Sequence, residues 1–283
     1  MSSGPRHIGG LSEIIDAFDL FLIDQFGVLH DGRTPYPGAI EVLQAIKTAG
    51  KIALVLTNSG KRAVQNEERL LRMGLPRDGF SAVVSSGEVG WHAIDEGQFG
   101  PPFVPGAKVF VVGRRGDDYG LDGLDLTVTD EPAKASALLI LGCDAPRVSL
   151  AHYRRLLAPA AKAGVPALCS NPDTWMLSSK GLQPAPGALA EIYEGLGGKV
   201  RYLGKPYPDI YRYALKHAPG VAASRVLAIG DSVEHDIAGA SQMGFASLLV
   251  RGGILVAVDE AGLGRLYAEH KAWPTFTTQM LAK

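Results

Sequence analysis

Short apolar runs that end in a polar residue or a glycine recur along the chain, and most are separated by stretches with helical spacing. Few of the runs alternate strictly between apolar and polar residues, so we expect parallel strands that are buried on both faces of a sheet. Gly38–Gly50, Lys61–Met73 and Asp209–His217 show helical spacing. This alternation of strands and helices predicts a doubly wound α/β fold. The predicted strands are Leu20–Asp24, Ile52–Thr57, Ala82–Ser85, Val109–Gly113, Ala137–Gly142, Val165–Ser170, Val226–Asp231 and Ala246–Val250.

Three of the predicted strands end in residues that can do chemistry, namely Asp24, Thr57 and Asp231. In open α/β sheets ligands bind at the carboxyl ends of the strands. Strands often end in polar residues for no functional reason, but here two carboxylates and a hydroxyl would meet at one edge. The pattern therefore favours a ligand site at that edge.

The composition is typical of a globular protein and excludes several classes of function. Hydrophobic residues make up 46% of the 283 residues and charged residues 20%, which is enough apolar material for a core. A net charge of −1 leaves no basic excess for binding nucleic acid. The two cysteines cannot form a disulfide framework, as is usual in a reducing compartment. We expect no signal peptide, no membrane span and a cytoplasmic location, because no apolar run is long enough for either segment.

The first two strand ends carry candidate catalytic groups. Asp24 stands at the tip of the strand in FLIDQFGVL. A carboxylate there can attack phosphorus, and it can bind Mg²⁺ through one oxygen while the other attacks. Thr57, Asn58 and Ser59 follow the next run, where a hydroxyl and backbone N–H groups at a helix start can hold an anion. Asn58 or Ser59 could also simply cap the helix, and the two roles are compatible.

Two later segments carry candidate charges. Lys205, in LGKPYPDIY, can neutralise phosphoryl oxygens as a point charge, although alone it would be an ordinary surface lysine. Asp231 and Asp236, in LAIGDSVEHDI, lie at a strand end and a helix start. Such a pair suits a hard cation and the groups that support it. Asp236 could instead be a first-turn charge that the helix dipole favours.

The four segments FLIDQFGVL, LVLTNSG, LGKPYPDIY and LAIGDSVEHDI, in this order, resemble the haloacid dehalogenase superfamily of phosphohydrolases. The stretches LTNSGKR, SSGE and SNPDTW look like its class IIA group, which includes nucleotide, sugar-phosphate and pyridoxal-phosphate phosphatases. The resemblance implies a three-layer α/β/α Rossmann-like core with a mainly parallel sheet, interrupted by an α/β cap. We place the core at residues 1–85 and 179–283 and the cap at residues 86–178.

The resemblance also implies a role for each matching residue. Asp24 would be the nucleophile and a Mg²⁺ ligand, and Phe26 would offer its backbone carbonyl to the metal. Thr57 and Lys205 would hold the phosphoryl oxygens of a small phosphorylated metabolite. The remaining assignments are Asp231 and Asp236 at the metal and Asn58, Ser59, Asn171 and Asp173 near the substrate. Dimerisation through the cap is implied in the same way.

One position departs from the pattern of the superfamily. Two residues after the nucleophile, its phosphatases carry a second aspartate that protonates the leaving group and then activates water. Phe26 occupies this position, as an aromatic residue does in one branch of class IIA. General acid–base catalysis contributes about 10²–10⁴-fold, so we expect slow hydrolysis of ordinary esters unless His30, Asp31 or His235 replaces the acid.

The missing acid keeps other functions open. The chain could bind a phosphorylated ligand or partner without turning it over, although retention of Asp24, Thr57, Lys205 and Asp231 favours catalysis. It could also hydrolyse substrates with good leaving groups, such as acyl phosphates. A serine esterase of the GDS type is a weaker alternative. The GDS sequence stands here at Gly230, far from the N-terminus where such enzymes carry it.

Overall fold

The computed structural model describes residues 4–145, 147–178 and 181–283, and the chain divides into two compact units. The chain passes from one unit to the other after Thr57, Ala63, Val84 and Gly204. The first unit consists of Met1–Thr57, Val64–Val84 and Lys205–Lys283, and the second of Asn58–Ala63 and Ser85–Gly204.

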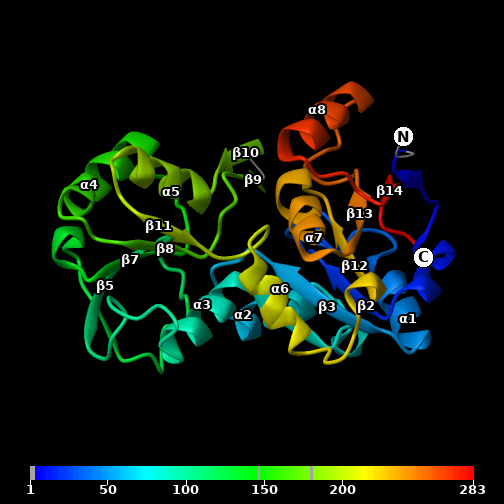
Figure 1. The fold of residues 1–283 in the computed structure, drawn as a ribbon, viewed down its shortest axis with the longest axis horizontal. Coiled ribbons are helices and arrows are strands. Elements are labelled where there is room, and N and C mark those ends of the chain that lie inside the picture. Colours follow the sequence, from blue (N-terminus) through cyan, green and yellow to red (C-terminus); the bar gives the residue numbers. More distant parts are fainter. Residues whose placement is uncertain (1–3, 146, 179–180) are drawn as a thin grey trace. The chain divides into compact units, whose positions relative to one another are not determined.

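A seven-stranded sheet forms the centre of the first unit (Figure 1). The side chains of its inner strands are mostly apolar and buried. From β1 (Arg6–His7) to β3 (Ile52–Thr57) along this sheet, each pair of neighbouring strands is parallel. The register places Ile23 beside Ile229 and Val55, so β2 (Leu20–Ile23) lies between β12 (Val226–Gly230) and β3 (Ile52–Thr57). In spatial order the strands are β1 (Arg6–His7), β14 (Phe276–Thr278), β13 (Ala246–Val250), β12 (Val226–Gly230), β2 (Leu20–Ile23), β3 (Ile52–Thr57) and β4 (Ala82–Ser85).

Helices follow the strands of the first unit in chain order. The apolar side chains of α8 (Glu260–His270) pack with Leu249 of β13 and with Ile237 in one core cluster, as expected for an amphipathic helix. A single π-helical turn, Val233–Ile237, is separated from the end of β12 by two residues and leads directly into α7 (Ala238–Met243). The helices are α1 (Ala39–Thr48), α2 (Ala63–Arg72), α6 (Pro208–Leu215), α7 (Ala238–Met243) and α8 (Glu260–His270).

The second unit is built on a five-stranded parallel sheet with helices on both faces (Figure 1). Leu138 and Ile140 pack with side chains of α4 (Leu150–Lys162) and α5 (Pro186–Gly195). Leu139 points to the other face and packs with Ile94 of α3 (Ser86–Asp95). The strands, in spatial order, are β11 (Val200–Tyr202), β8 (Ala167–Cys169), β7 (Ala137–Ile140), β5 (Ala107–Val112) and β6 (Leu126–Val128); β9 (Trp175–Ser178) and β10 (Gly181–Pro184) form an antiparallel hairpin.

The α/β fold with mainly parallel strands predicted from the sequence is confirmed, and each of the eight predicted strands overlaps an observed one. The second unit also contains α5 and β11, which lie beyond the boundary drawn at residue 178. The division into a core and an inserted cap at the stated residues stays a prediction. Within the described residues, no helix combines the length and the apolar character needed to cross a membrane.

Candidate active site

The carboxyl ends of β2, β3 and β12 bring three of the predicted site residues to one edge of the first sheet. Asp24 directly follows β2 and continues its ladder, since its backbone N–H donates to Ile229 O at 2.8 Å. Asp231 directly follows β12, and Thr57 is the last residue of β3. Because β2 pairs in parallel with both neighbours, the two carboxylates and the hydroxyl are placed side by side by the backbone alone.

Lys205 is the cation at the centre of this edge. Its Nζ donates to Asp24 Oδ1 at 2.6 Å and to Asp236 Oδ1 at 2.7 Å. The other oxygen of Asp236 accepts from the backbone N–H of Ser232 at 3.1 Å, which fixes the orientation of that carboxylate. Lys205 and Asp236 are each 4% exposed, and Asp24 is 9% exposed. The lysine is therefore a buried charge with two carboxylate partners and not a surface residue.

Burial and neighbouring charges shift the titration of these groups. Burial raises the pKa of Asp24 well above its ordinary value; Lys205 opposes the rise, and Asp236 and Asp231 add to it. Burial alone would lower the pKa of Lys205, but the carboxylates of Asp236 and Asp24 raise it well above its ordinary value. The lysine thus stays protonated, while the site gathers more negative charge than one lysine can neutralise.

The excess of carboxylates is suited to a cation. Asp24, Asp231 and Asp236 are all buried and each offers one carboxylate oxygen, and these oxygens lie within 4.8 Å of one another. Hard divalent cations such as Mg²⁺ prefer oxygen ligands of this kind. The donor set therefore fits the predicted metal, and the acidic cluster consists of three of the residues named for it from the sequence.

Glycines enclose the carboxylate of Asp231. A Cβ at Gly27 would lie 2.0 Å from Asp231 Oδ2, and one at Gly253 would lie 1.8 Å from the same atom. Gly27 also has a φ of +88°, which other residues rarely adopt. The backbone N–H of Ile254 donates to Asp231 Oδ2 at 2.9 Å. Two loops can approach this carboxylate only because neither carries a side chain at the point of contact.

Replacing Lys205 with methionine should lower the free energy of unfolding by about 3–5 kcal/mol, because it leaves buried carboxylates without their cation. Urea unfolding at neutral pH measures the change. Lys205 opposes the rise in the pKa of Asp24, so without the lysine this pKa rises further, and the loss of stability should shrink as the pH falls and Asp24 is protonated. Lys47→Met is the matched control: its ion pair with Asp78 is exposed and contributes at most about 1 kcal/mol. Equal losses in the two variants would contradict the assignment of Lys205 as a buried partner.

The residues predicted to lie near the substrate belong to the second unit. Asn58 Nδ2 donates to Asp173 Oδ1 at 2.7 Å, and the backbone N–H of Asp173 donates to Asn171 Oδ1 at 3.1 Å. The structure thus brings these three together although 115 residues separate Asn58 from Asp173. Ser59 Oγ accepts from the backbone N–H of Lys61 at 3.3 Å in a local turn. Their contact with a substrate stays a prediction.

The segment that carries Asn58 and Ser59 is fastened to the start of α3. The backbone N–H of Gly87 donates to Ser59 O at 3.0 Å, and Ser85 Oγ donates to Lys61 O at 2.6 Å. A Cβ at Gly87 would lie 2.2 Å from Gly60 O, so the two backbones are in direct contact. The stretches LTNSGKR and SSGE, separate in the sequence, are thus joined in one piece of structure.

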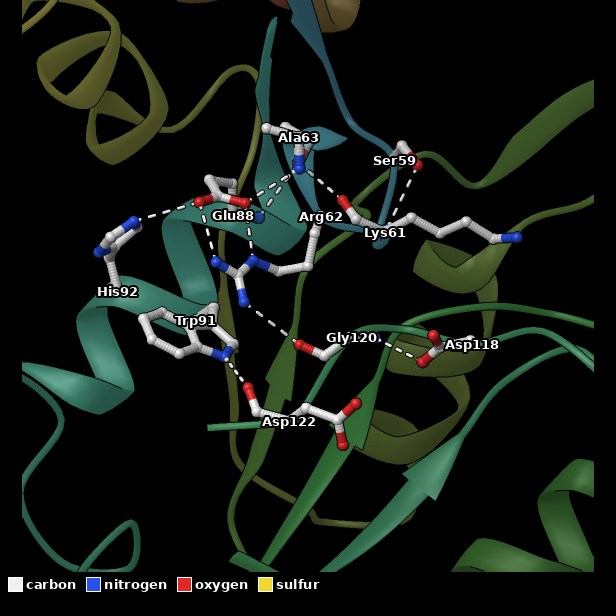
Figure 2. Close-up of polar contacts among 11 residues, drawn as sticks. Ser59, Lys61, Arg62, Ala63, Glu88, Trp91, His92, Asp118, Gly120 and Asp122 are labelled. Carbon is white, nitrogen blue, oxygen red and sulfur yellow. Dashed lines mark hydrogen bonds and ion pairs between the residues drawn. The ribbon is translucent and has the colours of Figure 1, made fainter. Parts of the chain in front are cut away.

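The side chains of Arg62 and Glu88 form an ion pair that also joins the segment after Asn58 to α3, as Figure 2 shows. Arg62 Nε and Nη2 donate to the two carboxylate oxygens of Glu88 at 2.7 and 3.0 Å. The guanidinium also lies over the Trp91 ring at 4.0 Å and donates to Gly120 O at 3.3 Å. The carboxylate accepts in addition from the N–H of Ala63, the first residue of α2, at 3.0 Å. Paired oxygens and a stacked guanidinium make a geometrically specific contact.

Replacing Glu88 with glutamine should lower the free energy of unfolding by about 1–3 kcal/mol, since a half-buried arginine loses its charged partner. Burial raises the pKa of Glu88, but the bonds from Arg62 and Ala63 outweigh this and the pKa is lowered. The ionised glutamate therefore stabilises the fold at pH values above its unfolded pKa. The difference in free energy of unfolding between the wild type and Glu88→Gln should vanish as the pH falls and Glu88 is protonated. Urea unfolding at several pH values measures this, with Glu131→Gln as control because its pair with Lys134 is exposed. A Glu88→Gln effect no larger than that of the control would show that the pair is dispensable.

Comparisons with known proteins agree with this geometry. The family model of haloacid dehalogenase-like hydrolases matches residues 21–127, which include Asp24 and Thr57. A second model, described as HAD-hydrolase-like, matches residues 202–276, which include Lys205, Asp231 and Asp236. The chain belongs to the haloacid dehalogenase superfamily. The membership and the hydrolase class predicted from the sequence are thereby confirmed.

Relatives of this superfamily resemble the chain along most of its length. Human chronophin is 26% identical over 281 residues, which cover 96% of this chain and 94% of chronophin. A solved haloacid dehalogenase-like hydrolase from Brucella suis 1330 is 28% identical with a TM-score of 0.84, covering 97% of this chain and 100% of that one. The glycerol phosphate phosphatase of Mycobacterium tuberculosis, solved in complex with calcium, is 25% identical with a TM-score of 0.65, covering 85% and 68%.

The position where this chain departs from the superfamily motif is occupied by an aromatic pair. The ring of Phe26 meets that of His30 edge to face, with centroids 5.7 Å apart. His30 is fully buried, and its Nδ1 accepts from the N–H of Gly32 at 2.9 Å. Burial lowers the pKa of His30 to about 4, so at neutral pH the imidazole is uncharged and its remaining proton is on Nε2. A neutral imidazole is a poor acid.

Asp31 is equally unsuited to replace the missing acid. Backbone N–H groups of Thr34 and Arg33 lower the pKa of Asp31, and each donates to its Oδ1 at 2.8 Å. The carboxylate is therefore ionised at neutral pH and accepts hydrogen bonds from these fixed donors. Of the three groups considered from the sequence, His30 and Asp31 have the wrong protonation state for a general acid at neutral pH.

Sequence reasoning did not identify Gln25, Asn66, Arg62 or Glu88. Gln25 Nε2 donates to Thr57 Oγ1 at 2.7 Å, which places it in contact with a predicted site residue. Its signal in the sequence was a polar residue directly after Asp24. Glu88 lay within the stretch SSGE that carries the class IIA resemblance, but its partner Arg62 is 26 residues away. Such a pairing cannot be inferred without a three-dimensional arrangement.

Proposed function

We propose that this chain hydrolyses a small phosphorylated metabolite through an aspartyl-phosphate formed on Asp24. The observation that carries the proposal is the buried arrangement of Asp24 and Lys205, joined at 2.6 Å, at the edge of the sheet that also presents Asp231. A carboxylate with a fixed cation beside it is the arrangement that nucleophilic catalysis at phosphorus needs. Relatives named as phosphatases, including the one from Mycobacterium tuberculosis, support this class of reaction.

A divalent cation fits the acidic cluster, and we assign Mg²⁺ to it. Asp24, Asp231 and Asp236 supply the buried carboxylates, and the backbone carbonyl of Phe26 is a further candidate ligand. The calcium in the Mycobacterium tuberculosis relative supports a site for a hard divalent cation. When bound, such a cation would neutralise negative charge on the phosphoryl group and on the carboxylates.

In the first step, a carboxylate oxygen of Asp24 attacks phosphorus. A bond forms between that oxygen and phosphorus, and the bond from phosphorus to the leaving oxygen breaks, with its electron pair going to the leaving group. One oxygen of Asp24 is held by Lys205, which fixes the rotamer of the carboxylate and leaves the other oxygen for the attack. Thr57 and Lys205 stabilise the phosphoryl oxygens by hydrogen bonding and charge.

In the second step, water attacks phosphorus, the bond from phosphorus to the Asp24 oxygen breaks, and the carboxylate is regenerated as phosphate leaves. The leaving oxygen of the first step has to gain a proton, and the attacking water of the second step has to lose one. Phe26 can take part in neither proton transfer, because its side chain carries no ionisable group. Substrates whose leaving group is stable as an anion need little protonation, so acyl phosphates should be better substrates than alkyl phosphates. The preference for acyl phosphates over alkyl phosphates follows from the absence of an acid at Phe26.

Phe26 also supports a second candidate, a protein that binds a phosphorylated ligand without turnover. The two candidates differ in what they require of the nucleophile. A binding protein gains nothing from a buried carboxylate facing its anionic ligand, because like charges repel. Retention of Asp24 beside Lys205 therefore favours catalysis.

A panel of phosphorylated metabolites tests the proposal. Phosphate release is measured with Mg²⁺ and with EDTA, and the panel includes an acyl phosphate, an aryl phosphate and alkyl phosphates. We expect release that depends on Mg²⁺ and is fastest for the acyl phosphate. Binding of a beryllium or aluminium fluoride complex with Mg²⁺ is measured in parallel, since it reports the phosphoryl site without turnover. Binding without release would favour the second candidate, and neither binding nor release would exclude both.

A further inference from the structure

The carboxamide of Gln25 joins the strand end of the nucleophile to two other elements of the first unit. Gln25 follows Asp24 directly, and its side chain is buried, with the residue only 2% exposed. Nε2 donates to Thr57 Oγ1, at the end of β3, at 2.7 Å, and to Asn66 Oδ1, on α2, at 3.2 Å. Asn66 is also 2% exposed. The two hydrogens of the amide nitrogen are thus used in bonds to two buried acceptors, the hydroxyl of Thr57 and the carbonyl oxygen of Asn66.

This bond restricts what the Thr57 hydroxyl can do. A threonine hydroxyl has one hydrogen and accepts through its lone pairs. Because Oγ1 accepts from Gln25, its own hydrogen is directed away from the amide. A hydroxyl that has to donate to a phosphoryl oxygen needs its hydrogen directed in this way. An amide N–H is a suitable partner because it donates and does not accept.

The amide is not arranged for the stability of the fold alone. Gln25 Oε1 is buried and has no hydrogen-bond partner within the part of the chain that the structure describes. Leaving such an acceptor unsatisfied is unfavourable, and an apolar side chain of similar size would avoid that penalty. Gln25 therefore uses its nitrogen for two hydrogen bonds and leaves its oxygen unsatisfied among the described residues. We take the direction in which its N–H groups donate as the reason for a glutamine here.

We propose that Gln25 is a positioning residue that acts through Thr57: its amide orients the threonine hydroxyl as a donor to the phosphoryl group, and Asn66 orients the amide. This inference rests on the proposed function, which gives Thr57 a phosphoryl oxygen to bind. Gln25 itself touches neither the nucleophile's carboxylate nor the transferred group in this role. Gln25 fixes the direction of the Thr57 hydroxyl, which Asp24, Lys205 and Asp231 do not determine.

Three substitutions separate direction from packing. Gln25→Met keeps the length and removes the donor, and kcat/KM for phosphate release should fall about 10-fold, the loss of one oriented hydrogen bond. Gln25→Glu should fall further, because a carboxylate would accept the hydrogen of Thr57 and reverse the bond. Asn66→Leu should lower kcat/KM less than either. The exposed Gln44→Met serves as the control for the same substitution elsewhere in this unit and should leave kcat/KM unchanged.

A double-mutant cycle with Thr57→Ala decides whether Gln25 acts through Thr57. Gln25→Met should lower kcat/KM in the wild-type background and cause no further loss once the hydroxyl is gone. Equal losses in the two backgrounds would overturn the proposal, as would an order in which the Gln25→Glu variant retains more activity than the Gln25→Met variant. Affinity for inorganic phosphate with Mg²⁺ is measured in the same variants. If the wild type binds phosphate but releases none from any substrate, the proposed function fails while the cycle can still be read from binding.

Discussion

Replacing Asp24 with asparagine is expected to lower phosphate release by more than about 10⁴-fold, as removal of the nucleophile does in other hydrolases. An amide oxygen of the same size cannot form the aspartyl-phosphate, so the first step has no acceptor. The fold should persist, because Lys205 keeps its bond to Asp236 at 2.7 Å. Phosphate release and urea unfolding are measured on the same preparation.

The stability of this variant should remain at or above that of the wild type in the absence of metal. Burial raises the pKa of Asp24, and the carboxylates of Asp236 and Asp231 add to the rise, so the ionised group is destabilising where it stands. Removing one negative charge from the cluster relieves that repulsion. The exposed Asp16→Asn is the control for the chemical change and should alter neither property. An Asp24→Asn enzyme with undiminished turnover would mean that another residue is the nucleophile.

The opposite changes expected in activity and stability have a common cause. The nucleophilic role proposed for Asp24 places a carboxylate in a desolvated site close to other charges, and those conditions penalise the folded state. The raised pKa of Asp24 reflects this penalty, and Lys205 offsets part of it. The same logic explains why backbone contacts, such as Ile254 N–H to Asp231 at 2.9 Å, enclose the acidic cluster.

Much of this site could be predicted from the sequence because parallel strands impose it. Once Leu20–Ile23 and Val226–Gly230 are recognised as neighbouring strands, Asp24 and Asp231 must meet at one edge. The same holds for Thr57 at the end of β3. The strand ends and the order of the motifs can both be read from the sequence, and with parallel strands they suffice to place these three groups.

Other features depended on contacts that no local pattern encodes. The superfamily resemblance assigned Lys205 to the phosphoryl oxygens, but the sequence did not indicate its two ion pairs, and the structure shows it buried against Asp24 and Asp236. Gln25 donates a hydrogen bond to Asn66, which lies on a helix 41 residues later in the sequence. The strand β11 joins β8 in the second sheet, although it stands next to a core motif in the sequence. Partners that are distant in the chain are chosen by packing, which single-sequence periodicity does not report.

Replacing Phe26 with aspartate is expected to raise turnover of alkyl phosphates by about 10²–10⁴-fold, the usual contribution of general acid–base catalysis. The new carboxyl group would stand where the superfamily motif carries its second aspartate. It could protonate the leaving oxygen and then take a proton from the attacking water. Acyl phosphates, whose leaving group needs no proton, should gain little from the same change. The ratio of alkyl to acyl turnover is therefore the quantity to measure.

The matched control is Phe26→Asn, which removes the same ring and has the same size but carries no acid. Both substitutions uncover His30, whose ring meets that of Phe26 at 5.7 Å, so both should destabilise the loop to a similar degree. Only the aspartate variant should raise the alkyl-to-acyl ratio, and its gain should depend on pH as a titrating carboxyl group requires. If asparagine and aspartate change the ratio equally, the effect comes from space around the substrate, and a group elsewhere already transfers the proton. If neither changes it, proton transfer to the leaving group does not limit this enzyme, and the slow step lies in attack by Asp24 or in product release.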